Sequence, residues 1–120
     1  MKIPTRIKGS ISESIAVERL KQLGYTSISQ NYLTKSGEID LIMKDKDFIV
    51  FIEVKSIAEN SGFSIYESLT SEKKRRISKA INKWLLEHNM LDEPWRFDFV
   101  GIVLNGEEVR SFDHFQFVEL

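Results

Sequence analysis

The stretch GEIDLIMKDKDFIVFIEVK, residues 37–55, decides the fold because it reads as two β-strands joined by a tight charged turn. The second strand is almost wholly apolar over residues 48–52, which is typical of a strand inside a buried sheet. Charged groups in such a place need a compensating partner. Three carboxylates and an amine nevertheless occupy this strand pair: Glu38, Asp40, Glu53 and Lys55.

Hydrophobic periodicity on either side of this hairpin predicts two helices and three further strands. The helices are expected at residues 10–24 and 71–89, and the strands at 25–33, at 96–104 and within 107–118. Ser71 is the expected N-cap of the second helix, and Asn105-Gly106 is a type I′ turn signal between the last two strands. The order α-β-β-β-α-β-β predicts an α/β protein, with a mixed sheet and flanking helices in a single domain over residues 1–120.

Composition excludes several kinds of site. The chain of 120 residues has no cysteine and two histidines, so disulfides, thiolate zinc sites and cysteine nucleophiles are absent. A metal would therefore be held by oxygen, which favours Mg²⁺, Mn²⁺ or Ca²⁺. No apolar run approaches the roughly 20 residues that span a bilayer, and Met1–Lys8 lacks the apolar core of a secretory signal. We expect a cytoplasmic protein with no membrane partner.

The basic residues are unevenly distributed, although the net charge is only −1. Residues 1–83 contain 15 basic and 10 acidic side chains, whereas residues 84–120 contain 2 and 8. Six of the 17 basic residues lie between Lys73 and Lys83. Such a local basic face can bind phosphates, so we expect Lys73, Arg76 and Lys83 to contact nucleic acid. The alternative is an ordinary solvated helix face, because charge runs usually are that.

Strand geometry brings the charged residues of the hairpin to one face of the sheet. If Met43 pairs with Phe48, Asp40 and Glu53 become diagonal neighbours with Cβ atoms about 7 Å apart, and Lys55 projects from the same face. A register slip of one residue would separate them. Two carboxylates at that spacing can share a divalent cation, and a lysine beside them suits phosphodiester hydrolysis. A structural Lys–Glu ion pair at the strand end is the competing interpretation.

The spacing of these residues resembles a known nuclease pattern. Asp40, twelve intervening residues and Glu53-Val54-Lys55 match the D-x(n)-(D/E)-x-K motif of the PD-(D/E)xK nuclease superfamily. Over almost its whole length the chain resembles the YraN family of small bacterial proteins, which is similar to archaeal Holliday-junction resolvases. The further matching residues are Gly9, Glu13, Gly24-Tyr25, Asn31-Tyr32, Gly37-Glu38-Ile39, Phe51, Lys73 and Arg96-Phe97-Asp98.

This resemblance implies a restriction-endonuclease-like fold and a metal-dependent DNA endonuclease. Asp40, Glu53 and the Val54 carbonyl would bind Mg²⁺ or Mn²⁺, Lys55 would be the catalytic lysine, and Glu13 would be an accessory acid at the metal. Branched DNA is the substrate that the resolvase similarity implies. Symmetric cutting of two strands would require a homodimer.

The chain departs from the family pattern at two places. Ser56-Ile57 stands where the family commonly has Thr-Arg, so an arginine that could hold phosphate is missing, and Ile39 replaces the proline before Asp40. The alternative function is therefore a catalytically weak or inactive nucleic-acid-binding or adaptor domain of the same fold. A third hypothesis is a protein-interaction domain without affinity for DNA.

Overall fold

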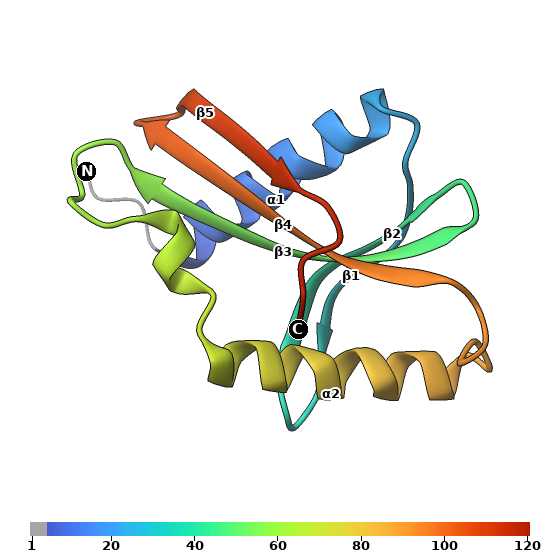
Figure 1. Cartoon of the computed structure of the whole chain (residues 1–120). Coiled ribbons are helices and arrows are strands. Elements are labelled where there is room, and N and C mark those ends of the chain that lie inside the picture. Colours follow the sequence, from blue (N-terminus) through green and yellow to red (C-terminus); the bar gives the residue numbers. More distant parts are fainter. Residues whose placement is uncertain (1–4) are drawn as a thin grey trace.

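The computed structural model describes the backbone of residues 5–120 and the side chains of residues 11–120 (Figure 1). The surroundings of Gly9 lie outside these described side chains. The elements are α1 Thr5–Gln22, β1 Thr26–Leu33, β2 Glu38–Asp45, β3 Phe48–Ala58, the 3₁₀ helix η1 Ile65–Ser68, α2 Ser71–Glu87, β4 Trp95–Asn105 and β5 Glu108–Phe115. The predicted α-β-β-β-α-β-β order is confirmed.

The strands of the described residues form one mixed sheet in the order β1-β2-β3-β4-β5. β3 and β4 are parallel and the other neighbours are antiparallel. Because the connection between β3 and β4 crosses over the sheet, it carries η1 and α2 onto one face, as such parallel connections require. The arrangement is consistent with the restriction-endonuclease-like fold that the sequence predicted.

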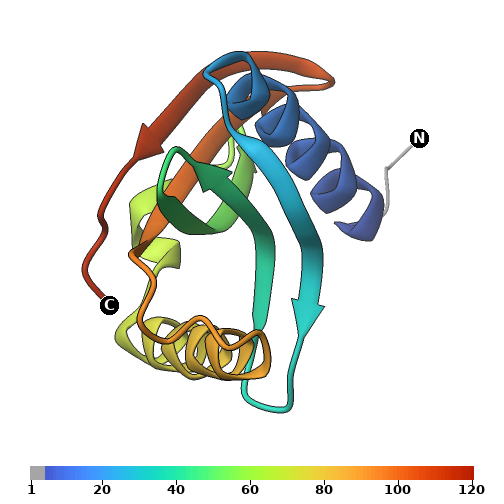
Figure 2. The same ribbon diagram turned by 90° about the vertical axis from the view of Figure 1, so that its right-hand side faces the viewer.

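The two helices cover opposite faces of the sheet, as Figure 2 shows. Ile77, Ile81 and Trp84 of α2 pack with Phe51 in one core cluster. Ala16 and Leu20 of α1 pack in a second cluster, with Leu41, Val50, Ile52 and Ile102. β3 therefore has a buried side chain at every position from Ile49 to Ile52, which explains why its apolar run does not alternate with polar residues.

The hairpin between β2 and β3 differs from the predicted register. The turn contains only two residues, with Lys46 in the left-handed region at φ 54°. Met43 consequently pairs with Val50, so the predicted pairing of Met43 with Phe48 is wrong by two residues. Since strand side chains alternate with a period of two, this shift leaves each side chain on its predicted face and changes only which residues are opposite one another.

The N-cap of α2 and the turn between β4 and β5 were also predicted wrongly. The N-cap of α2 is Thr70 rather than Ser71, and its hydroxyl accepts a hydrogen bond from the Lys73 amide at 3.2 Å. The turn after β4 begins at Gly106, because Asn105 still pairs with Glu108. Only Gly106 has a positive φ in that turn, whereas a type I′ turn needs two such residues.

A buried ionic network ties the end of the chain to the sheet. The Arg96 guanidinium donates to Asp98 Oδ1 at 3.0 Å and to Asp45 Oδ2 at 3.1 Å. Asp98 Oδ2 also lies at hydrogen-bond distance from His114 Nε2, at 2.8 Å, and Asp98 Oδ1 accepts a hydrogen bond from the backbone N–H of Phe117 at 3.2 Å. Arg96 therefore has a structural role. Within residues 5–120, neither α-helix is long and apolar enough to cross a bilayer.

Candidate active site

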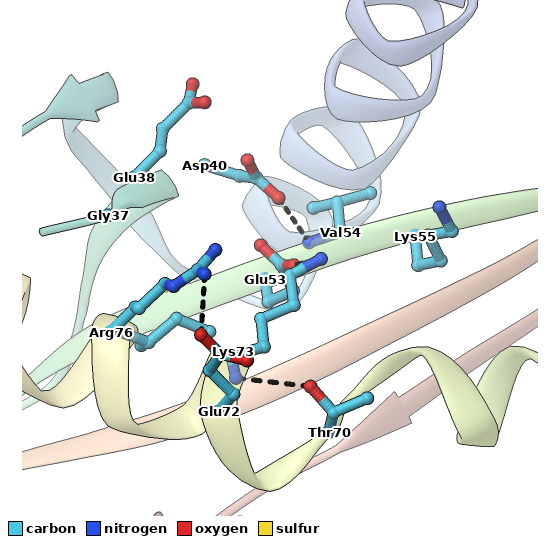
Figure 3. A pocket seen from close by; sticks show the side chains of 11 residues that line it. Gly37, Glu38, Asp40, Glu53, Val54, Lys55, Thr70, Glu72, Lys73 and Arg76 are labelled. Atoms are coloured by element: carbon cyan, nitrogen blue, oxygen red, sulfur yellow. Dashed lines mark hydrogen bonds and ion pairs between the residues drawn. The ribbon is translucent and has the colours of Figure 1, made fainter.

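The candidate site lies where β2 and β3 separate (Figure 3). Their backbone pairing ends at Leu41 and Ile52, one residue before Asp40 and Glu53 would come directly opposite each other. Asp40 Oδ2 accepts a hydrogen bond from the Val54 amide at 2.8 Å, so a side chain replaces the next backbone partner. Beyond this point β2 continues beside β1 and β3 continues beside β4, which opens a fork between the two strands.

Asp40 and Glu53 form a closely coupled acid pair at this fork. Burial of the Asp40 carboxyl, followed by its hydrogen bond to Glu53 and the negative charge of Glu53, raises the pKa of Asp40 to about 9. The Val54 N–H favours the ionised form and opposes this shift only in part. At neutral pH and without a bound cation, the raised pKa favours a protonated Asp40 carboxyl beside Glu53.

Lys73 supplies the positive charge that balances Glu53. Its Nζ atom lies 2.5 Å from Glu53 Oε2, and it reaches the strand from the first turn of α2. The Glu53 side chain is only 6% exposed, whereas that of Lys73 is 40% exposed. The lysine that the sequence suggested for phosphate contact thus lies directly on a candidate metal ligand.

Lys55 follows Glu53 on the same face of β3 and lines the same cleft. Among the described side chains, Lys55 has no carboxylate within 4.0 Å, because Glu53 pairs with Lys73 instead. The competing interpretation, a structural pair between Lys55 and Glu53, is therefore not the arrangement that forms. The half-buried Lys55 side chain lies further along β3 than the acid pair, as Figure 3 shows.

Gly101 lies beside Lys55 on the neighbouring strand, although it does not line the cleft, and sequence reasoning missed it. It is paired with Lys55 across β3 and β4. A Cβ atom at this position would lie 2.7 Å from Cγ2 of Ile65, the buried first residue of η1. Only glycine lets η1 dock here. An isolated glycine inside a strand pattern was the available signal, because it often marks a close approach to the backbone.

Glu13 of α1 lies at the edge of this acidic cluster. Asn31 bridges it to Glu38 when the amide nitrogen faces the two carboxylates, donating to Glu13 Oε1 at 2.8 Å and to Glu38 Oε1 at 3.2 Å. Burial and the charges of Glu38 and Glu53 raise the pKa of Glu13, against the Asn31 hydrogen bond. Asn31 holds φ 53° within β1, a conformation that asparagine tolerates.

A cleft of about 670 Å³ joins these groups to the start of α2. Its lining residues are Gly37, Glu38, Asp40, Glu53, Val54, Lys55, Thr70, Glu72, Lys73, Arg76 and Ile77. Arg76 donates to Glu72 at 2.7 Å at the rim. Lys83 lies further along α2, 3.8 Å from Glu87, and neither it nor Glu13 is part of the lining.

The oxygen ligands of this fork fit a hard divalent cation. Among the described residues, no group of three Asp, Glu, His or Cys side chains is already assembled to hold a metal ion. Two carboxyl groups are nevertheless held together at the cost of a retained proton and a bound ammonium group. Mg²⁺ or Mn²⁺ would satisfy both carboxylates at once, and either ion uses few protein ligands.

Comparison with known proteins adds a family match. A family described as "Uncharacterised protein family UPF0102" matches residues 12–102. A UPF0102 protein of Clostridium kluyveri is 41% identical over 97 residues, covering 81% of this chain and 80% of the relative. Another, from Geotalea uraniireducens, is 39% identical over 106 residues, covering 88% and 84%.

A solved structure also shows a weak likeness. It is described as "The structure of Pyrococcus Furiosus SfsA in complex with Ca2+". The two proteins share 13% sequence identity with a TM-score of 0.35, and the match covers 95% of this chain and 64% of the other.

Proposed function

The chain belongs to the uncharacterised protein family UPF0102, the YraN family that its sequence resembles, and we propose that it is a metal-dependent DNA endonuclease. The observation that carries this proposal is the pairing of half-buried Asp40 with buried Glu53, with Lys55 two residues beyond Glu53 in the same cleft. Acid pairs of this kind are costly to the fold, and they are common where a site needs a cation.

In this proposal the fork between β2 and β3 holds Mg²⁺ or Mn²⁺. The ligands would be Asp40, Glu53 and the Val54 carbonyl, with Glu13 at the edge of the site. When bound, the cation supplies Lewis-acid polarisation of the phosphate and a more acidic water. The chain itself fixes the Asp40 carboxyl through the Val54 N–H, so that the carboxyl is positioned before substrate arrives.

Lys55 has the position and freedom to act on the reacting phosphate. Its amine lines the cleft without a carboxylate partner among the described side chains, so its three donors are available. It would orient the attacking water or stabilise charge on the phosphorane. Arg76 at the rim would hold a neighbouring phosphate of the strand, with Lys83 contacting DNA further along α2.

Branched DNA cut symmetrically by a homodimer is the finer form of this proposal, and it rests on the resemblance to resolvases. Labelled linear, single-stranded, flap and four-way DNA, incubated with and without Mn²⁺, would test both forms. We expect Mn²⁺-dependent cleavage that falls by about 100-fold or more in Lys55→Ala and is lost in Asp40→Asn. Lys79→Ala is the matched control, because Lys79 is exposed on α2 outside the cleft.

One observation favours a second candidate, a nucleic-acid-binding domain without catalysis. Glu53 is already neutralised by Lys73, so the fold is electrostatically satisfied without a metal. This alternative predicts DNA binding whose affinity falls steeply with salt concentration, with no cleavage under any metal condition. Cleavage that persists in both Asp40→Asn and Lys55→Ala would contradict the proposed site altogether.

A further inference from the structure

We propose that Lys73 is a displaceable counter-ion: it occupies Glu53 while the cleft is free of metal, and it leaves when a divalent cation binds. Lys73 would thereby set the affinity of the site for that cation. This inference rests on the proposed function, because it requires a cation between Asp40 and Glu53. It goes further by assigning to one lysine of α2 a role in regulating the site.

The geometry makes Lys73 a substitute for a metal ion. Its ammonium lies 2.5 Å from Glu53 Oε2, an oxygen of one of the two carboxyl groups that are proposed to bind the cation. Glu53 is buried at the end of the apolar core, where a carboxylate without a positive partner is strongly disfavoured. A positive charge must therefore be present on Glu53 in each state, and Lys73 provides it when no metal is bound.

The same geometry allows Lys73 to leave. Its side chain is 40% exposed and borders the open cleft, so its long flexible stem can swing into solvent. The backbone of Lys73 is fixed independently, because its amide donates to the Thr70 hydroxyl that caps the helix. Departure of the ammonium thus requires a change of rotamer and leaves α2 in place.

Electrostatic repulsion disfavours the simultaneous binding of both cations to Glu53. A divalent ion and an ammonium group within about 4 Å of each other repel strongly in a poorly solvated site. One must therefore leave as the other arrives, which makes binding competitive. The released amine would lie on the solvent side of the cleft that Arg76 also lines, where it could contact a phosphate, so metal binding would also prepare the site for DNA.

Calorimetric titration of Mn²⁺ into the full-length protein tests the competition. Lys73→Met removes the competing ammonium while keeping an unbranched side chain. We expect it to bind Mn²⁺ about three- to tenfold more tightly than wild type, the equivalent of one partly exposed ion pair. Lys79→Met removes the same charge from the exposed side of α2 and should change the affinity less than about twofold at 0.15 M salt.

A second measurement uses the wild-type protein and does not depend on how a variant folds. NMR signals of the Lys73 ε-methylene and ammonium groups are assigned with Lys73→Arg and followed during titration with Mg²⁺. We expect them to shift and their ammonium protons to exchange faster with water as the site fills, while the Lys79 signals stay constant.

The outcomes of these experiments distinguish the role of Lys73 from the proposed metal-dependent function. Equal or weaker Mn²⁺ affinity in Lys73→Met, or Lys73 signals that ignore Mg²⁺ although it binds, would overturn the role of Lys73 and leave the metal site intact. No binding of either ion to wild type or Lys73→Met would overturn the metal site, and this inference with it.

Discussion

At Asp40 one carboxyl group serves both the sheet and the candidate chemistry. It accepts a hydrogen bond from the Val54 N–H where backbone pairing stops, and its hydrogen bond to Glu53 helps to raise its pKa. Glu53 in turn binds Lys73. In the absence of a cation, the raised pKa of Asp40 and the ammonium of Lys73 thus limit the repulsion between the two carboxyl groups. Burying these groups still costs the fold free energy.

This raised pKa makes a prediction about stability. A carboxyl that is protonated in the folded protein up to about pH 9, yet ionised in the unfolded chain above about pH 4, binds more protons when folded. The free energy of unfolding therefore falls as pH rises between these values, by at most about 1.4 kcal/mol per pH unit. In Asp40→Asn this contribution should vanish, because the amide does not ionise.

Urea unfolding of metal-free wild type and Asp40→Asn at pH 5 to 8 measures the effect. The amide oxygen of the variant can still accept the Val54 N–H, and its NH₂ group can donate to Glu53. We expect the variant to gain stability relative to wild type as the pH rises. A difference that stays constant over this range would mean that Asp40 is ionised in the folded protein.

The separate contributions of sequence and structure are clearest at this scale. Alternation along the strands was enough to place Asp40, Glu53 and Lys55 on one face, even though the predicted register was wrong by two residues. The partner of Glu53 was not predictable in the same way. Lys73 lies twenty residues further along the chain, and its contact depends on how α2 docks against the sheet.

At the scale of elements, Gly101 of β4 and Ile65 of η1 pack against each other beside Lys55. The sequence predicted β4 as a strand but gave no partner for its glycine. The structure places Ile65 of η1 against it, on the face that carries Lys55. A larger side chain at Gly101 should therefore displace Ile65 of η1 next to Lys55.

We predict that Gly101→Ala destabilises the protein by about 1–3 kcal/mol, because the added Cβ would overlap Ile65 Cγ2. A double-mutant cycle with Ile65→Ala, followed by thermal unfolding, isolates this contact. The alanine at 65 should relieve the overlap, so that Gly101→Ala costs at least about 1 kcal/mol less in that background. Strictly additive effects would show that η1 does not rest on Gly101.

Turn geometry and capping explain the other errors at this scale. In sequence, a two-residue turn with Lys46 at positive φ looks no different from the four-residue turn that the predicted pairing of Met43 with Phe48 implies. Thr70 and Ser71 are both good caps, and the choice between them depends on which hydroxyl reaches the Lys73 amide. The presence of each helix and strand was predictable from hydrophobic periodicity, which does not depend on the length of a turn or on the choice of cap.

Across the whole molecule, the ionic network that stabilises the fold and the candidate catalytic groups consist of different residues. The network of Arg96, Asp98 and His114 holds the C-terminal segment against β4, whereas the acid pair lies at the fork between β2 and β3. Arg96-Phe97-Asp98 was noted as part of a family resemblance, but its role emerged only from the packed structure. Its residues are far from Tyr25 in sequence, although Arg96 donates to the Tyr25 hydroxyl at 2.5 Å.

The central claim is that this fork binds a divalent cation, and anomalous diffraction from a crystal soaked in Mn²⁺ tests it most directly. With data collected at the manganese edge, we predict a single strong peak between the carboxyl groups of Asp40 and Glu53, with the Lys73 ammonium moved away from Glu53. A Mn²⁺-soaked crystal without a peak at this position, and with Lys73 still on Glu53, would contradict the account.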